Sequence, residues 1–115
     1  MKRDTDLIRK LLFEYEADSD WLLITPGSTG DDIELPEAYH VHLMMDEGIL
    51  VEVGDHTMRL TAAGHDLLDA IRSDTIWAKT KDAGKVVGGL SLSFLGEVAK
   101  GYIKQELQTK LGFTF

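Results

Sequence analysis

The chain of 115 residues is long enough for one domain of ordinary size, and its 43% hydrophobic content allows a substantial core. It contains no cysteine, which excludes disulfides, thiolate zinc sites and a cysteine nucleophile. The formal net charge of −8 argues against a protein that coats nucleic acid non-specifically.

The charge is unevenly distributed along the chain. Residues 1–10 have a net charge of +2, residues 11–58 contain twelve acids and neither Lys nor Arg, and residues 59–115 again have a net charge of +2. An acidic stretch of this kind usually serves solubility, and its use in binding is the alternative. No apolar run approaches the roughly 18 residues of a membrane-spanning helix, and the charged N-terminus is not followed by a signal-type apolar region. We therefore expect a cytoplasmic protein.

The first half of the chain predicts two helices separated by a short strand. Apolar residues at helical spacing predict a helix over residues 4–17, with Asp4 as its N-cap. The apolar run 21–25 predicts a strand that is followed by a loop. A second helix is expected over residues 35–47, with Pro36 at its first position and Gly48 in the left-handed position after its end.

The second half predicts a hairpin and further helices. Two alternating segments, 49–53 and 57–61, predict a β-hairpin whose turn is formed by Gly54 and Asp55. Thr61 is expected to cap a third helix, which either continues through Trp77 or breaks near Ser73. Glycines between residues 84 and 89 predict a flexible joint, and residues 91–110 a last helix that packs on the core or is exchanged in a dimer.

The order helix, strand, helix, hairpin and helix is the layout of a compressed winged helix, an α+β domain, with an additional C-terminal helix. We expect the winged-helix-like domain over residues 1–83, and the glycine-flanked joint with the C-terminal helix over residues 84–115. In this layout residues 35–47 take the place of the recognition helix, and residues 54–56 form the tip of the wing.

The opening residues, the central Tyr39-His40, the segment 59–72, and Trp77 followed by Lys81 together resemble domain-of-unknown-function family 2513. This family occurs in bacteria, phages and prophages, and the resemblance extends from residue 1 to about residue 82. It implies a small phage- or prophage-type protein in a bacterial or phage-infected cell, and it implies no activity. The motif residues are Arg3, Asp4, Asp6, Tyr39, His40, Arg59, Thr61, Gly64, His65, Asp69, Arg72, Trp77 and Lys81.

The histidines do not have the spacing of a metal or catalytic site. His40 and His42 lie on nearly opposite sides of a helix, whereas a helical metal pair needs the spacing i, i+4. His42 has that spacing with Asp46 but no evident third ligand, and His65 with Asp69 lacks an accompanying nucleophile motif. We therefore expect packed or hydrogen-bonded histidines, no metal, no cofactor, no catalytic residue and no enzyme.

Two other side chains leave alternatives open. Arg59 alternates with Met58 and Leu60, so it is expected either to pair with an acid such as Glu52 or to reach a phosphate as a wing arginine. Trp77 either fills the junction between helices or, if partly exposed, anchors a protein interface.

Two hypotheses for function follow. The predicted recognition helix contains no Lys, Arg, Asn or Gln, and its acids would repel phosphates. The first hypothesis is a non-catalytic protein-interaction module whose acidic helix and wing face binds a basic partner, or imitates nucleic acid to block a host protein, with the C-terminal helix available for a homodimer. The second is a DNA-binding transcriptional regulator that uses its basic flanks. The candidate acidic face comprises Asp31, Asp32, Glu34, Glu37, Asp46, Glu47, Glu52 and Asp55, and the candidate nucleic-acid contacts are Lys2, Arg3, Arg9, Lys10, Lys79, Lys81 and Lys85.

Overall fold

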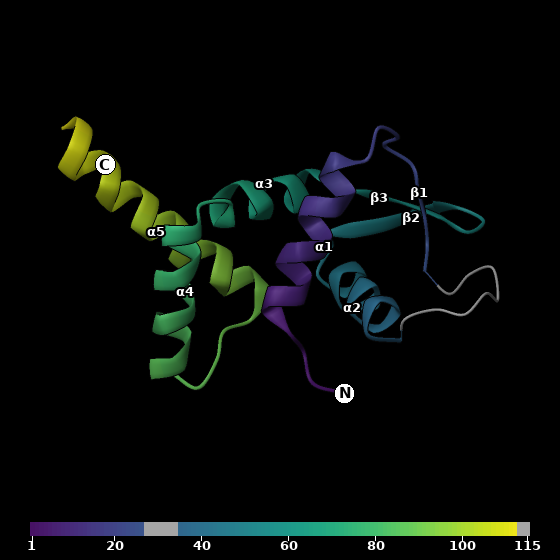
Figure 1. Cartoon of the computed structure of the whole chain (residues 1–115), viewed down its shortest axis with the longest axis horizontal. Helices are drawn as coiled ribbons and strands as arrows, with labels where there is room; N and C mark the ends of the chain where they lie inside the picture. The colour runs from purple at the N-terminus through teal and green to yellow at the C-terminus, as the bar shows by residue number, and fades with distance from the viewer. Residues whose placement is uncertain (27–34, 113–115) are drawn as a thin grey trace. The chain divides into compact units, whose positions relative to one another are not determined.

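The computed structural model describes residues 1–26 and 35–112, which form an α+β fold with five helices and one three-stranded antiparallel sheet (Figure 1). The α+β class is therefore confirmed. The elements are α1 (Thr5–Ala17), β1 (Leu23–Ile24), α2 (Leu35–Asp46), β2 (Leu50–Gly54), β3 (Thr57–Leu60), α3 (Ala62–Ile71), α4 (Asp74–Val86) and α5 (Leu92–Leu111).

The chain divides into two compact units, which are Met1–Leu68 (unit 1) and Asp69–Phe115 (unit 2). This division falls within α3, earlier in the chain than residue 83, where the sequence places the boundary between the expected domains. Unit 1 therefore holds the whole sheet, and unit 2 holds α4 and α5.

The first helix begins where its sequence predicts. The Asp4 carboxylate accepts a hydrogen bond from the Leu7 N–H at 3.1 Å, which satisfies one of the free donors in the first turn. Ile8, Leu11 and Leu12 are buried at helical spacing. This face lies in the core of unit 1, where α1 packs against α2.

The sheet has the order β1-β3-β2, so the strand before α2 pairs with the second strand of the hairpin. That strand is shorter than expected, because only Leu23 and Ile24 pair with β3. Leu23 lies opposite Met58, and Leu50 lies opposite Leu60. These four side chains are buried, which makes one face of the sheet part of the core.

The hairpin turn lies one residue later than predicted. Asp55 and His56 form it, and His56 has the left-handed φ of 59° that few residues other than glycine adopt. Gly54 belongs to β2, because the register shifts between Glu52 and Gly54 and this irregularity adds a residue to that strand.

A tight junction joins α2, β2 and α3. Gly48 has a φ of 72° after the end of α2, as predicted. The Thr61 hydroxyl contacts the carbonyl groups of Gly48 and Ile49 and accepts the Gly64 N–H at 3.0 Å, which caps α3. A Cβ on Gly64 would lie 2.3 Å from the Ile49 carbonyl oxygen. The backbones of α3 and of the residue before β2 are therefore so close that only glycine fits at position 64.

In unit 2 the helices break at Ser73, the second of the two alternatives. Ser73 caps α4 by accepting the Ile76 N–H at 3.3 Å, and Ser91 caps α5 in the same way. The predicted joint is shorter than expected, because Gly84 is buried inside α4 and the chain turns only at Gly88 and Gly89, with φ of 82° and 123°. The last helix matches its predicted range closely and packs against α4.

Candidate functional site

His40 has a structural position. It is buried, and its Nε2 accepts the Asp4 backbone N–H at 2.8 Å while its Nδ1 donates to the Pro36 carbonyl at 2.6 Å. A backbone N–H only donates and a carbonyl only accepts, so these partners place the ring proton on Nδ1. His40 thus holds the start of α1 against α2. The prediction of a hydrogen-bonded ring is confirmed for this residue. His42 and His65 are exposed.

Further motif residues contact one another. Arg72 donates to the Asp69 carboxylate at 2.8 Å, and the Lys81 ammonium lies 5.8 Å from the centre of the Trp77 ring. Trp77 is buried, so the alternative of a partly exposed interface anchor does not apply. Both pairs join residues about one helical turn apart, at the spacings i, i+3 and i, i+4.

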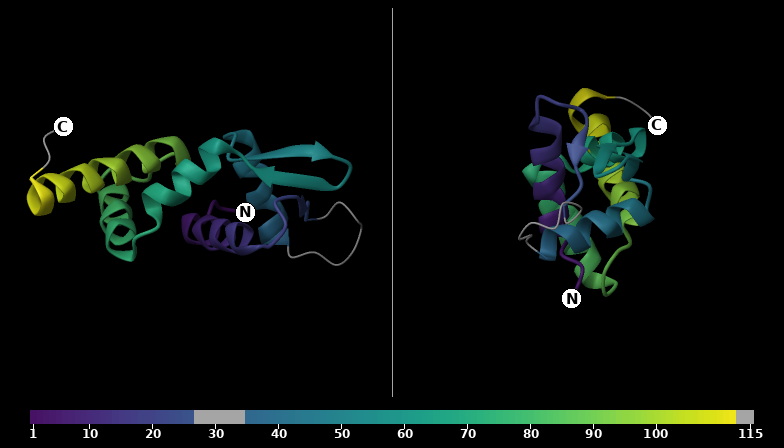
Figure 2. Two further views of the ribbon diagram at one scale, coloured as in Figure 1. Left: turned by 90° about the horizontal axis from the view of Figure 1, so that it is seen from above. Right: turned by 90° about the vertical axis from the view of Figure 1, so that its right-hand side faces the viewer.

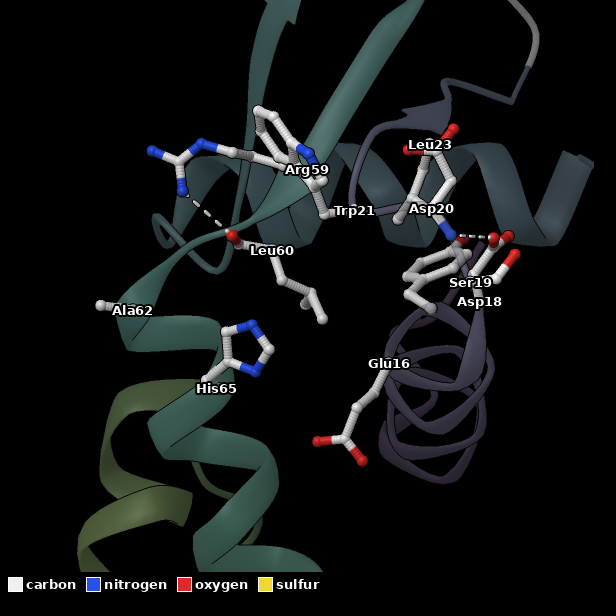
Figure 3. A pocket seen from close by; sticks show the side chains of 11 residues that line it. Glu16, Asp18, Ser19, Asp20, Trp21, Leu23, Arg59, Leu60, Ala62 and His65 are labelled. Atoms are coloured by element: carbon white, nitrogen blue, oxygen red, sulfur yellow. Dashed lines mark hydrogen bonds between the residues drawn. The ribbon is translucent and has the colours of Figure 1, made fainter.

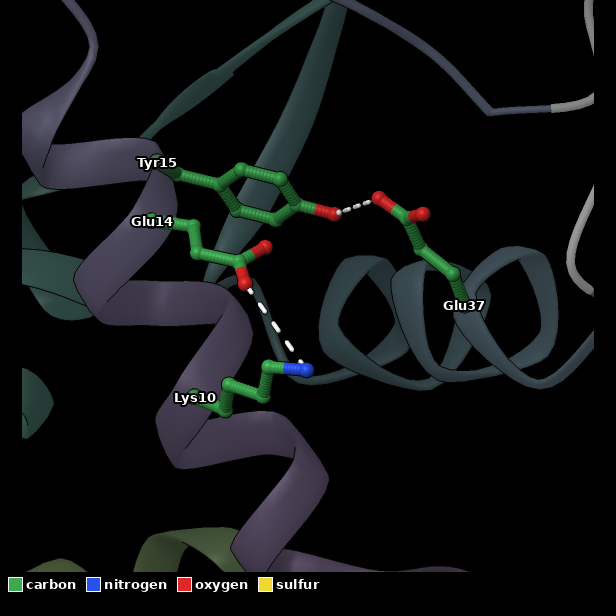
Figure 4. Close-up of polar contacts among 4 residues, drawn as sticks. All are labelled: Lys10, Glu14, Tyr15 and Glu37. Carbon is green, nitrogen blue, oxygen red and sulfur yellow. Dashed lines mark hydrogen bonds and ion pairs between the residues drawn. The ribbon is translucent and has the colours of Figure 1, made fainter.

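Glu37, a member of the candidate acidic face, forms part of the contact between α1 and α2. Its carboxylate accepts the Tyr15 hydroxyl at 2.9 Å (Figure 4). Burial raises the pKa of the Tyr15 phenol far above its ordinary value, and the hydrogen bond to the negatively charged Glu37 raises it further. Glu37 therefore faces a neighbouring helix and is partly buried.

Four other acids of that face surround β2 and are exposed. Asp46 ends α2 and Glu47 follows it before the strand, Glu52 lies on the strand, and Asp55 lies in the turn. We call this group the acidic edge. Asp31, Asp32 and Glu34 lie outside the described residues.

The sheet has a second face that the sequence did not single out. Val51 lies opposite Arg59, and Ile24 lies opposite Thr57, on the side away from the buried leucines. Ile24 is 71% exposed and Val53 45% exposed. Leu22 and Val51 are also exposed. We call this surface the outer sheet face; its members are Ile24, Val51, Thr57 and Arg59, and the exposed Leu22 and Val53 adjoin it in sequence.

The expected pair between Arg59 and Glu52 is wrong. Glu52 lies opposite Met58, whose side chain belongs to the buried face, whereas Arg59 belongs to the outer sheet face. Cross-strand partners share a face, so residues on opposite faces do not meet. Arg59 instead donates to the Leu60 carbonyl at 3.1 Å.

A pocket of about 470 Å³ lies in unit 1 beside the acids that end α1 (Figure 3). Figure 3 shows Glu16 and His65 extending from α1 and α3 toward the space between these helices. Its acidic lining suits a positively charged group, and Trp21, which is 70% exposed, lies at the same pocket. Within the described residues, no three His, Cys, Asp or Glu side chains are grouped so that they could hold a metal ion. The charged and aromatic lining residues are Tyr15, Glu16, Asp18, Asp20, Trp21, Arg59 and His65.

The candidate nucleic-acid contacts are distributed over both units, and several have partners within their own unit. Lys10 approaches Glu14 at 4.0 Å, and Lys85 approaches Asp82 at 3.7 Å. Arg9 lies 4.9 Å from the centre of the Phe13 ring. Residues 1–68 contain fifteen acids and five basic residues, a net charge of −10, whereas residues 69–115 contain five acids and seven basic residues, a net charge of +2.

Comparison with known proteins agrees with the resemblance that the sequence motifs suggested. The model of a family of hypothetical proteins, DUF2513, matches residues 2–91. An uncharacterized protein of Haemophilus influenzae is 36% identical in an alignment of 118 positions that covers 93% of this chain and 99% of that protein. No solved structure matches the chain. In the described parts of the chain, no helix is both long and apolar enough to cross a membrane.

Proposed function

This chain belongs to the DUF2513 family of hypothetical proteins, and we propose that it is a non-catalytic protein-interaction module that binds a basic partner. The observation that supports this proposal is the position of the acidic edge next to an exposed apolar surface, the outer sheet face. Apolar area provides the free energy of association, and the surrounding acids select for a partner of opposite charge.

The charge of unit 1 supports the same proposal. Its net charge of −10 creates a field that attracts basic surfaces and speeds their association. Between residues 11 and 58 no lysine or arginine interrupts this field. A narrower version is that the acidic surface imitates nucleic acid and occupies the binding site of a host nucleic-acid-binding protein.

We further propose that unit 1 is a winged-helix-like domain in which β2 and β3 form the wing. The view from above shows this hairpin extending beyond α1 and α2 (Figure 2, left). The helix in the recognition position, α2, contains none of the Lys, Arg, Asn and Gln side chains that read base edges. This composition favours a protein over DNA as the partner of α2. A phage or prophage origin and a cytoplasmic location accompany the proposal.

Affinity purification from a bacterial lysate tests the proposed function. The wild-type chain should enrich proteins with basic surfaces, identified by quantitative mass spectrometry. Reversing the acidic edge (Asp46→Lys, Glu47→Lys, Glu52→Lys, Asp55→Lys) should remove them, because these acids are exposed. The matched control reverses four exposed acids of unit 2, Asp69, Asp74, Asp82 and Glu97, and should retain them. Equal enrichment by both variants would reject this surface as the binding site.

DNA binding through the basic flanks is a second candidate, which the net charge of +2 in unit 2 favours. Gel-shift titration against duplex DNA tests it. Binding should disappear when Lys79, Lys81 and Lys85 are changed to Ala, because phosphate contacts depend on cations. Binding that survives these changes together with Ala at Lys2, Arg3, Arg9 and Lys10 would exclude this candidate.

A homodimer through α5 is part of the proposal. Phe94 and Leu111 on this helix are 56% and 64% exposed, and a second copy would cover such side chains. Light scattering coupled to size-exclusion chromatography should report a dimer that Phe94→Ser and Leu111→Ser convert to a monomer.

A further inference from the structure

We infer that the pocket of about 470 Å³ in unit 1 binds a guanidinium group, that of an arginine side chain presented by the basic partner. The inference rests on the proposed function and specifies which side chain of the partner is recognised. It requires an apolar hollow that takes a side chain, carboxylates that bind its charge, and an aromatic surface on which the planar cation lies.

The apolar part of the pocket suits the methylene chain of an arginine. Leu23 in β1 and Leu60 in β3 line it, and both are buried, so they form an apolar surface that is already in place. The volume falls in the range of about 300–1,000 Å³ that is usual for ligand pockets, so a whole side chain fits. The lining residues belong to unit 1, where they come from α1, β1, β3, α3 and the segment after α1.

Two aspartates at the pocket have carboxylates whose orientation is fixed. Asp18 accepts the Asp20 backbone N–H at 2.9 Å, and Asp20 accepts the Leu22 backbone N–H at 3.1 Å. A carboxylate has about four lone-pair sites, so both can accept further N–H groups from a ligand. Glu16 extends toward the same space from α1 (Figure 3). A guanidinium group presents five N–H donors in one plane, which suits several carboxylates around one pocket.

Trp21 supplies the aromatic surface. Its side chain is 70% exposed and lines the same pocket, whereas Trp77, the other tryptophan of the chain, is buried. A guanidinium group stacks on an aromatic ring, because it is planar and more weakly hydrated than an ammonium group. An exposed tryptophan beside carboxylates therefore favours arginine over lysine.

Arg59 also lines the pocket, but its guanidinium bonds elsewhere. It donates to the Leu60 carbonyl at 3.1 Å, and Figure 3 shows it directed away from Asp18 and Asp20. The lining therefore keeps acids that can bind an incoming cation. Because Arg59 belongs to the outer sheet face as well, the pocket adjoins the surface that we propose for the partner.

NMR titration of the isotope-labelled full-length protein with N-acetyl-arginine amide tests the inference, because this probe carries its only charge on the side chain. The indole N–H signal of Trp21 should shift in a saturable manner, while that of the buried Trp77 should not. N-acetyl-citrulline amide, the neutral analogue of the same shape, should bind at least about tenfold more weakly. N-acetyl-lysine amide should bind at least about threefold more weakly.

Removal of the two aspartate charges tests the role of the carboxylates. Asp18→Asn together with Asp20→Asn should raise the dissociation constant of the arginine probe at least about fivefold. Asparagine keeps a carbonyl acceptor for the two backbone N–H groups, so the local turn is retained. The matched control, Asp46→Asn with Glu47→Gln, removes the same charge at exposed positions outside the pocket and should stay within roughly twofold of the wild type. Equal effects of the two variants would overturn the pocket as the site.

Trp21→Ala tests the aromatic contact independently, since an exposed side chain contributes little to stability. Followed at the backbone N–H of Ser19, another lining residue, this variant should weaken the arginine probe at least about threefold. It should also reduce the preference for arginine over lysine. Unchanged affinity and preference would contradict the inference.

The remaining outcomes separate this inference from the proposed function. A Trp21 signal that does not respond to the arginine probe, or responds equally to the citrulline probe, overturns the inference whatever the lysate experiment returns. Equal binding of the arginine and lysine probes overturns the assignment to guanidinium. In the lysate experiment, Asp18→Asn with Asp20→Asn should also lose the basic proteins. If this variant retains them while reversal of the acidic edge removes them, the proposed function stands and the inference fails.

Discussion

His40 shows how much a single buried polar side chain contributes to unit 1. Its two ring nitrogens bond to the Asp4 N–H and the Pro36 carbonyl. We predict that His40→Ala lowers the free energy of unfolding by roughly 2–4 kcal/mol, because it creates a cavity and leaves two polar groups without partners. His42→Ala, at an exposed position of the same helix, should change it by no more than about 0.5 kcal/mol. Urea denaturation measures both, and equal effects would contradict the assigned role.

Ionisation of the Tyr15 phenol should lower the free energy of unfolding of unit 1 at alkaline pH. Because burial and Glu37 raise the pKa of its phenol in the folded chain, the unfolded chain loses this proton first. Its contribution is therefore complete below the unfolded pKa of about 10 and declines above that pH. We predict that the thermal midpoint falls more steeply above about pH 10 in the wild type than in Tyr15→Phe. Superimposable profiles would contradict the prediction, since lysines titrate in both proteins.

At the residue scale, the sequence predicted side chains whose role is set by near neighbours. Asp4 as an N-cap and Gly48 in a left-handed conformation depend on a few adjacent residues, and both are confirmed. The bond between Asp4 and His40 was not predictable, because it joins residues from two helices. For the same reason Glu37 was assigned to a free acidic face although Tyr15 contacts it.

At the scale of elements, α3 approaches the start of β2 so closely that position 64 has no room for a side chain. We predict that Gly64→Ala destabilises the protein by roughly 1–3 kcal/mol, because the new Cβ meets the Ile49 carbonyl oxygen at 2.3 Å. Gly101→Ala is the matched control, since no atom lies within 4 Å of its added Cβ in the exposed part of α5. That control should stabilise the chain by up to about 1 kcal/mol through helix propensity. Thermal unfolding compares them, and the same sign for both would refute the argument.

The elements were predicted where hydrophobic periodicity and capping residues agree. Helices α1, α2 and α5 match their expected ranges within a few residues. The hairpin turn was misplaced by one residue. The sequence Gly54-Asp55 is typical of a turn, but the register irregularity keeps Gly54 in β2 and places His56 in the turn. The joint was overestimated, because Gly84 looks flexible in sequence but is buried within α4.

At the scale of the whole molecule, charge is divided unequally between the two units, −10 against +2. Repulsion within unit 1 opposes compaction, and salt screens it over a Debye length of about 10 Å at 0.1 M. We predict that raising NaCl from about 0.01 to 0.15 M at pH 7 increases the thermal midpoint by about 2–5 °C. Near the isoelectric point of the whole chain, about 4.8, the increase should be smaller, because fewer carboxylates of unit 1 are ionised. A midpoint that falls with added salt would show that attractive ion pairs dominate instead.

The candidate site was predictable only in part at this scale. The acids of residues 11–58 are evident from the sequence, and four of them surround β2 as exposed side chains. The outer sheet face was not evident, because valines on either face of a strand look alike until the register is known. The pocket beside Trp21 combines α1, β3 and α3, which are distant in sequence.

The order of the strands in the sheet also limits the order in which they can pair during synthesis. β1 pairs with β3 and not with the hairpin's outer strand, so it has no partner until β3 has been synthesised. The hairpin closes through a local turn, whereas β1 must be joined across the whole of α2. During synthesis on the ribosome, the segment containing Trp21 and Ile24 therefore has no β3 to pair with until α2 and the hairpin have been synthesised. We therefore expect the shortest strand of the sheet to be added last.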